Sequence, residues 1–235
     1  MKNLKVNIYA DGANIQNIKL AKLNPLIKGF TTNPTLMRNS GIKNYKSFAK
    51  EALEIVNGSP ISFEVFSDDL DEMYKQAKEI SSWGNNISVK IPITNTLGIS
   101  TKNLLASLSK EGIFCNVTAI FTIEQIEKTF EACDPNCPLI LSIFAGRIAD
   151  TGIDPVPIMD KAVQITKSRE HVQVLWASPR EVLNIKQADQ IGCHIITVTD
   201  DLLKKLSNFD KNLEDFSLET VKMFYQDAKS SGYEI

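Results

Sequence analysis

Eight short apolar runs, separated by helical stretches, restrict the fold of this 235-residue sequence more than any other feature. Each run has the length of a β-strand, and successive runs begin 22 to 33 residues apart. The predicted strands are residues 6–11, 29–33, 61–66, 87–91, 114–118, 139–144, 172–177 and 194–198. Strands that alternate with helices indicate βαβ units and a parallel sheet. Eight such units predict a closed (β/α)8 barrel, the TIM barrel.

An open, doubly wound sheet is the alternative fold. Such a sheet usually carries a glycine-rich dinucleotide or phosphate loop, and neither motif occurs in this sequence. Beyond residue 207, apolar residues at helical spacing predict an additional C-terminal helix at about 213–230. Its apolar face must cover either the barrel or a neighbouring subunit. We expect residues 1–235 to form one domain.

Composition narrows the possible partners. The 26 Lys and Arg residues nearly balance the 28 Asp and Glu residues, giving a net charge of −2, so we expect no nucleic-acid partner. No apolar run reaches the roughly 18–20 residues of a membrane helix, and the N-terminus lacks the pattern of a signal peptide. The four cysteines and two histidines form no zinc motif. We therefore expect a cytoplasmic protein with reduced thiols, no bound metal and no membrane partner.

Polar residues interrupt these strands in a regular pattern. Strands of a parallel sheet are covered on both faces and usually read as continuous apolar runs. Here polar and apolar residues alternate, and alternate strand residues point to opposite faces. If the apolar set meets the outer helices, the polar set converges inside the barrel, mostly at the carboxyl ends where barrel enzymes place their active sites. That set is Asp11, Thr31, Asn33, Glu64, Lys90, Asn116, Thr118 and Ser142.

Lys90 is the most informative member of this set. A lysine is almost never buried unless it is paired, and one structural explanation is a pair with Glu64 or Asp11. The functional interpretation is an amine whose neutral form is favoured by burial and can form a Schiff base with a carbonyl substrate. Pro92 follows two residues later and is expected to end the strand.

Six motifs, in order along the chain, resemble the transaldolase family. They are YADGAN (9–14), GFTTNPT (29–35), VKIPIT (89–94), NVT (116–118), SIFAGRI (142–148) and ASPR (177–180). The match covers nearly the whole chain. Its length is similar to that of the short, single-barrel subfamily, which includes fructose-6-phosphate aldolase-like proteins.

The resemblance implies a class I, Schiff-base mechanism without a metal or organic cofactor, in sugar-phosphate metabolism such as the pentose phosphate pathway. Lys90 matches the Schiff-base lysine, and Asp11 the carboxylate that takes the proton from the C4 hydroxyl. Glu64 and Thr118 match the pair that holds the catalytic water. The implied substrate contacts are Thr31, Asn33, Asn116 and Ser142 for the dihydroxyacetone hydroxyls, with Arg147, Ser178 and Arg180 for the phosphate.

Two positions bear on whether the enzyme transfers or releases the three-carbon unit. Short aldolases of the family tend to have Gln at the position of Glu64 and Tyr at the position of Phe144, whereas transaldolases have Glu and Phe. The resemblance therefore favours a transaldolase that takes fructose 6-phosphate or sedoheptulose 7-phosphate as donor. The alternatives are cleavage that releases free dihydroxyacetone, a related enzyme for a modified sugar, a decarboxylating Schiff-base enzyme, and a non-catalytic phosphosugar sensor.

Three residues depart from the family pattern. One is Gly12, which follows Asp11 where Thr or Ser is more usual. Trp176 shares strand parity with Ser178 and either narrows the barrel or fills the core. Pro179 follows Ser178 and is expected to affect the phosphate loop. Short members of the family often form rings through a C-terminal helix, so a homo-oligomer, such as a pentamer or decamer, is expected.

Overall fold

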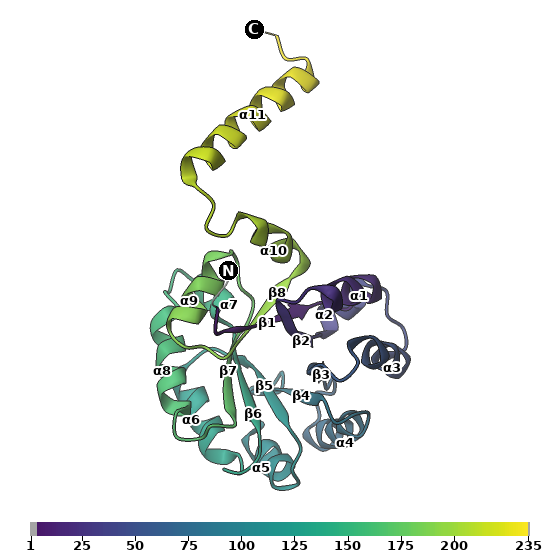
Figure 1. Ribbon diagram of the computed structural model, residues 1–235. Coiled ribbons are helices and arrows are strands. Elements are labelled where there is room, and N and C mark those ends of the chain that lie inside the picture. The colour runs from purple at the N-terminus through teal and green to yellow at the C-terminus, as the bar shows by residue number, and fades with distance from the viewer. Residues whose placement is uncertain (1–3, 235) are drawn as a thin grey trace.

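The computed structural model describes residues 4–234 and has a closed barrel of eight parallel strands, in sequence order, with β1 paired to β8. The predicted TIM barrel is thus confirmed (Figure 1). The strands are β1 Asn7–Asp11, β2 Ile27–Thr31, β3 Ile61–Glu64, β4 Ile87–Pro92, β5 Cys115–Ile120, β6 Leu139–Ile143, β7 Val172–Trp176 and β8 Ile195–Thr199. All eight coincide with predicted strands, and their ends differ from the prediction by two residues or fewer.

Helices follow the strands, and all except the last lie around the barrel. They are α1 Ile15–Leu23, α2 Pro34–Asn39, α3 Tyr45–Val56, α4 Leu70–Ser81, α5 Lys102–Lys110, α6 Ile123–Ala132, α7 Ala145–Ala149, α8 Val156–Thr166, α9 Leu183–Gln190 and α10 Asp200–Lys205, then a 3-10 turn at Leu206–Asn208 and α11 Leu213–Ser231. Side-chain caps fix several starts. Thr122 and Gln125 form a capping box at α6, and Asn33 caps α2 through its Oδ1 atom.

The apolar core lies mainly between the strands and the outer helices. Val89, Val117, Leu141 and Val174 are fully buried there, each on the outward face of its strand. This agrees with the predicted division of each strand into an outward apolar face and an inward polar one. Because the apolar strand residues pack against the helices, the inward-facing strand positions can carry polar side chains.

The barrel interior contains a second, smaller apolar cluster on one side. It consists of Tyr9, Ile140, Leu175, Ala177 and Ile195. Gly29 lies opposite Tyr9, and a Cβ atom at that position would come within 2.5 Å of the Tyr9 ring, so glycine leaves the ring its space. Burial raises the pKa of Tyr9.

Helix α11 extends away from the barrel (Figure 1). Its bounds agree with the predicted 213–230, but no residue along this helix, which lies wholly in the described part of the chain, is buried. Large apolar side chains are exposed on it: Leu213, Phe216, Leu218, Val221, Met223, Phe224 and Tyr225. The helix does not cover the barrel of its own chain, which excludes one of the two expected roles of its apolar face.

Candidate active site

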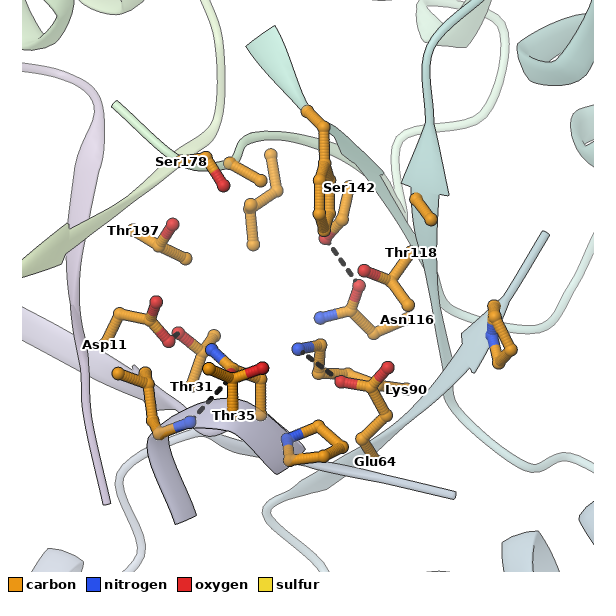
Figure 2. A pocket seen from close by; sticks show the side chains of 18 of the residues that line it. Asp11, Thr31, Thr35, Glu64, Lys90, Asn116, Thr118, Ser142, Ser178 and Thr197 are labelled. Atoms are coloured by element: carbon orange, nitrogen blue, oxygen red, sulfur yellow. Dashed lines mark hydrogen bonds and ion pairs between the residues drawn. The ribbon is translucent and has the colours of Figure 1, made fainter. Parts of the chain in front are cut away.

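A cavity of about 380 Å³ opens at the carboxyl ends of the barrel strands (Figure 2). Eleven of the twelve predicted site residues line it, from every strand or strand end between β1 and β7. They are Asp11, Thr31, Asn33, Glu64, Lys90, Asn116, Thr118, Ser142, Phe144, Arg147 and Ser178. The alternation of polar and apolar residues thus predicted which side chains converge.

Lys90 extends from β4 into this cavity and is only 7% exposed. Its Nζ atom lies 2.9 Å from Glu64 Oε2 and donates a hydrogen bond of 2.8 Å to the carbonyl oxygen of Thr32. Glu64 is opposite Lys90 on the neighbouring strand β3. The structural explanation of the buried lysine, a pair with Glu64, is therefore correct, and the pair also faces the cavity.

Asp11 ends β1 and faces the same cavity, with Thr31 beside it (Figure 2). Thr31 Oγ1 donates a 2.8 Å hydrogen bond to Asp11 Oδ1. Burial raises the pKa of Asp11, while the charge of Lys90 and the Thr31 hydrogen bond oppose that shift and the charge of Glu64 adds to it. A carboxyl group with a raised pKa is suited to both accepting and returning a proton.

A chain of hydrogen bonds crosses the barrel beneath Lys90. Ser142 Oγ donates to Asn116 Oδ1 at 2.6 Å, Asn116 Nδ2 donates to Ser62 Oγ at 3.1 Å, and the Ser62 and Ser88 hydroxyls are 2.7 Å apart. These bonds fix the orientation of the Asn116 amide. Thr118, directly above on β5, differs from them. Its hydroxyl oxygen is buried without a hydrogen-bond partner among residues 4–234, which suits a group that binds substrate or water.

The side of the cavity opposite Glu64 combines a cation with an aromatic ring. The guanidinium of Arg147, on α7, lies 5.6 Å from the centre of the Phe144 ring. Ser178 adopts a left-handed backbone conformation with φ of 55°. A Cβ atom on Gly146 would be 1.5 Å from the Ser178 carbonyl oxygen, so α7 approaches the end of β7 this closely only because residue 146 is glycine.

Arg180 is the one predicted site residue that does not line the cavity. It instead forms an ion pair with Asp150, in which Arg180 Nε donates to Oδ1 at 2.9 Å. This arginine lowers the pKa of Asp150. The basic side chains that line the cavity are therefore Lys90 and Arg147, and Arg180 lies outside it.

Trp176 lies outside the barrel interior. It is fully buried in the large core cluster, whereas its neighbours Leu175 and Ala177 line the cavity. The positive φ of Ser178 breaks the strand alternation, so Trp176 and Ser178 do not share a face. The expectation that Trp176 fills the core is confirmed, and a narrowing of the barrel by its side chain is not observed.

Sequence reasoning missed several lining residues. Thr197 on β8 and Thr35 at the start of α2 contribute hydroxyl groups, and Leu175 and Ala177 form an apolar wall. The alternation between Thr197 and its neighbours Ile196 and Val198 could have identified it, because β8 follows the same pattern as the other strands. The acceptor role of the Thr32 carbonyl has no sequence signature.

The described part of the chain has neither a metal-binding cluster nor a membrane-spanning helix. Between residues 4 and 234, no three His, Cys, Asp or Glu side chains are grouped so as to hold a metal ion. No helix in that range is both long and apolar enough to cross a bilayer. The four cysteines are buried free thiols, and burial raises the pKa of Cys193 to about 12.

Comparison with known proteins identifies the family. A family model described as transaldolase/fructose-6-phosphate aldolase matches residues 8–235. A "probable transaldolase" of Thermoanaerobacter sp. (strain X514) is 34% identical over 231 residues, which are 98% of this chain and 100% of that relative. Another, of Dehalococcoides mccartyi, is 35% identical over 202 residues, 86% of this chain and 90% of the relative.

Among solved structures, a 2,3-dimethylmalate lyase has a TM-score of 0.58 at 11% identity and covers 99% of this chain and 85% of its own. A putative phosphonomutase from Burkholderia cenocepacia J2315 has a TM-score of 0.57 at 8% identity, with 94% of both chains covered. These two similarities establish the barrel fold alone. The family match and the curated relatives go further: this chain belongs to the transaldolase/fructose-6-phosphate aldolase family and is a transaldolase-type enzyme.

Proposed function

We propose that this enzyme is a transaldolase that carries a dihydroxyacetone unit from a ketose phosphate to an aldose phosphate as a Schiff base on Lys90. The donor is fructose 6-phosphate or sedoheptulose 7-phosphate. One observation carries this proposal: a buried lysine amine, 2.9 Å from a carboxylate, shares a polar cavity with a second carboxylate, Asp11. Amine and carboxylates together are what imine formation and aldol cleavage require.

The first half-reaction forms and breaks bonds at C2 and C3 of the donor. Glu64 takes a proton from the Lys90 ammonium, the neutral Nζ atom adds to the C2 carbonyl, and that proton is returned to the C2 oxygen. The C2 oxygen then leaves as water, and a protonated imine remains. Glu64 and Thr118 hold the water and transfer its protons. Asp11 then takes the proton of the C4 hydroxyl. The C3–C4 electron pair moves toward the imine nitrogen, so an aldose phosphate departs and an enamine stays on Lys90.

The second half-reaction reverses these steps with a new aldose phosphate. Carbon C3 of the enamine attacks the aldehyde carbon, and Asp11 returns its proton to the new hydroxyl oxygen. Water then adds at C2 and frees Lys90. Phe144 lines the cavity at the place where a tyrosine would offer a hydroxyl, and it has no proton to give to the enamine. This favours transfer to an acceptor over release of dihydroxyacetone.

Substrate positioning is assigned to the remaining cavity residues. Asn116, Ser142, Thr31 and Asn33 are proposed to bind the hydroxyl groups of the three-carbon unit, which is supported by the fixed Asn116 amide and by the position of all four at the cavity. Arg147 and Ser178 are proposed to hold the phosphate, since a guanidinium binds phosphate oxygens in a fork geometry. A phosphate contact of Arg180 stays a prediction, and it would require the Arg180–Asp150 pair to open.

Borohydride trapping tests the proposal directly. The enzyme is incubated with fructose 6-phosphate, reduced with borohydride, and digested for mass spectrometry. We expect a three-carbon adduct on Lys90, and we expect turnover only when an acceptor such as erythrose 4-phosphate is added. Free dihydroxyacetone without an acceptor would indicate the aldolase alternative. An unmodified Lys90 in folded protein, across a panel of ketose phosphates, would contradict the Schiff-base mechanism.

We also propose that the protein is a homo-oligomer in which a second copy covers α11. Support comes from the exposed apolar residues of that helix, which include Phe216 and Phe224 at 41% and 63% exposure. Sedimentation of the full chain, compared with Phe224→Asp, measures this, and an unchanged monomeric mass in both would contradict it. The cytoplasmic location stays a prediction.

A further inference from the structure

The hydrogen-bond ladder between β2 and β3 stops short beside the catalytic lysine. Phe30 N–H donates to the Pro60 carbonyl at 2.8 Å, and two residues later Thr32 N–H donates to the Ser62 carbonyl at 3.1 Å. The next step of the same ladder would join residue 34 to the carbonyl of Glu64. Residue 34 is proline, which has no N–H group, and the chain turns there into α2.

The second hydrogen bond expected at this step of the ladder, between Glu64 and Thr32, is also missing. In a continued ladder, the Glu64 N–H would donate to the Thr32 carbonyl. That carbonyl instead accepts the 2.8 Å hydrogen bond from Lys90 Nζ. The N–H and C=O groups of Glu64 both lose their strand partners at the point where its side chain pairs with Lys90. Buried backbone groups without partners are costly, so this gap requires a substitute.

The substitute is one side-chain hydroxyl from helix α3. Tyr45 Oη donates to the Glu64 carbonyl at 2.9 Å and accepts from the Glu64 N–H at 2.8 Å. The Tyr45 ring is held by edge-to-face packing on Phe63, Phe66 and Trp83, with centroid distances of 6.1, 5.7 and 5.7 Å. Burial raises the pKa of Tyr45, so its hydroxyl stays protonated and can donate.

We propose that Tyr45 is a positioning residue for the Lys90–Glu64 pair: its hydroxyl satisfies the Glu64 backbone, and the Thr32 carbonyl is thereby free to orient the lysine amine. This inference rests on the proposed Schiff-base function of Lys90. Without the hydroxyl, the Glu64 N–H would turn to the Thr32 carbonyl, its acceptor in a continued ladder. Glu64 would then shift toward β2 and compete with Lys90 for that oxygen. Tyr45 does not line the cavity and acts only through Glu64 and Lys90.

The variant Tyr45→Phe keeps the aromatic packing and removes only the hydroxyl. We expect the rate of borohydride-trappable adduct formation on Lys90, and with it kcat, to fall on the order of 10- to 100-fold, as for a small misplacement of a reacting group. The affinity for inorganic phosphate, a probe of the distant Arg147 side, should stay within about twofold. Tyr74→Phe is the matched control, because it removes a hydroxyl hydrogen-bonded to Glu111 on the surface and should leave trapping unchanged.

A double-mutant cycle separates positioning from general support of the fold. Glu64→Gln removes the carboxylate partner of Lys90 but keeps the backbone groups that Tyr45 satisfies. If Tyr45 positions the Lys90–Glu64 pair, the part of the Tyr45→Phe loss that comes from the carboxylate should disappear in the Glu64→Gln background, since effects on interacting groups are not additive, and the part that comes from the Thr32 carbonyl should remain. Full additivity, or wild-type trapping by Tyr45→Phe, overturns the assignment. Failure of the wild-type enzyme to trap any ketose phosphate overturns the proposed function and this inference with it. Failure of Tyr45→Phe to differ from a trapping wild type overturns only this inference.

Discussion

The two sides of the barrel interior differ in chemistry, and they are built from different strands that share only β6. The polar side consists of Ser62, Ser88, Lys90, Asn116 and Ser142, on β3 to β6, together with Glu64. The apolar side is the cluster of Tyr9, Ile140, Leu175, Ala177 and Ile195, on β1 and β6 to β8. Ser142 and Ile140 are two residues apart on β6, where the two sides meet.

This division separates positioning from packing. On the polar side, each hydroxyl or amide of the chain beneath Lys90 has a named partner, so the groups near the reacting carbons are held in fixed orientations. The apolar side needs no such partners and closes the space beside them. It also keeps water away from one side of the cavity, which strengthens electrostatic interactions within it. Substitutions on the polar side should therefore change chemistry, and substitutions on the apolar side should change stability.

The largest effect is expected for Lys90→Met on the polar side. Loss of the nucleophile should lower turnover on the order of 10⁶-fold, the scale seen when a nucleophile is removed from a catalytic unit. Phosphosugar binding, measured by calorimetry, should persist within a few fold. Lys46→Met, which removes a surface pair with Glu79, is the control and should keep full activity. Turnover by Lys90→Met above about 1% of wild type would contradict the mechanism.

A smaller loss of activity is expected for Asp11→Asn, accompanied by a gain in stability. Without its proton acceptor, kcat should fall about 10²- to 10⁴-fold. Burial raises the pKa of Asp11 in the folded protein, so the folded state holds this proton more tightly than the unfolded chain does. The contribution of Asp11 to the free energy of unfolding is therefore fully present at pH values below its pKa in the unfolded chain. It is lost as the pH rises through its pKa in the folded protein. Asn does not titrate, so the variant should be the more stable protein at pH 7.

Urea unfolding of Asp11→Asn and wild type between pH 3 and pH 8 measures this difference. The gap in unfolding free energy should close at the acidic end. Asp150→Asn provides a control of opposite sign, because the Arg180 pair lowers the pKa of Asp150 and its stabilising contribution is lost as the pH falls. An Asp11→Asn protein that is less stable than wild type at pH 7 would contradict the argument from burial.

The sequence alone predicted the barrel and most of the polar side for the same reason. Strand alternation shows which residues share a face, and eight parallel strands bring their carboxyl ends together. Lys90 and Asp11 needed no further information. Strand alternation gives no guidance where the backbone leaves regular geometry: the left-handed Ser178 faces the cavity although its parity differs from that of Leu175 and Ala177, and the Arg180–Asp150 pair lies in a loop region with no period. Tyr45 was missed because its hydroxyl bonds the backbone of Glu64. Every residue has backbone groups, so the sequence does not show which of them a tyrosine binds.

The apolar side should respond in the opposite way. Ile195 is fully buried, and Ile195→Ala should lower the free energy of unfolding by roughly 2–5 kcal/mol through lost burial and a residual cavity. Ser88→Ala, on the polar side, removes one hydroxyl bonded to Ser62 and should cost only about 0.5–1.5 kcal/mol. Chemical denaturation of both variants measures the contrast. Equal losses would mean that the two sides contribute alike to stability.

The smallest effect on activity is expected at the rim, where α7 meets the end of β7. Gly146→Ala places a methyl group 1.5 Å from the Ser178 carbonyl oxygen, so the backbone must shift, at a cost of about 1–3 kcal/mol. The shift moves Ser178 away from Arg147, the two groups assigned to the phosphate. KM for fructose 6-phosphate should then rise several-fold while kcat changes little, because Lys90 and Asp11 lie on other strands. Steady-state kinetics measures both parameters. Gly152→Ala is the control for backbone strain alone, because a Cβ atom at Gly152 has no neighbour within 4 Å. A fall in kcat at unchanged KM would instead tie the rim to the chemistry of the polar side.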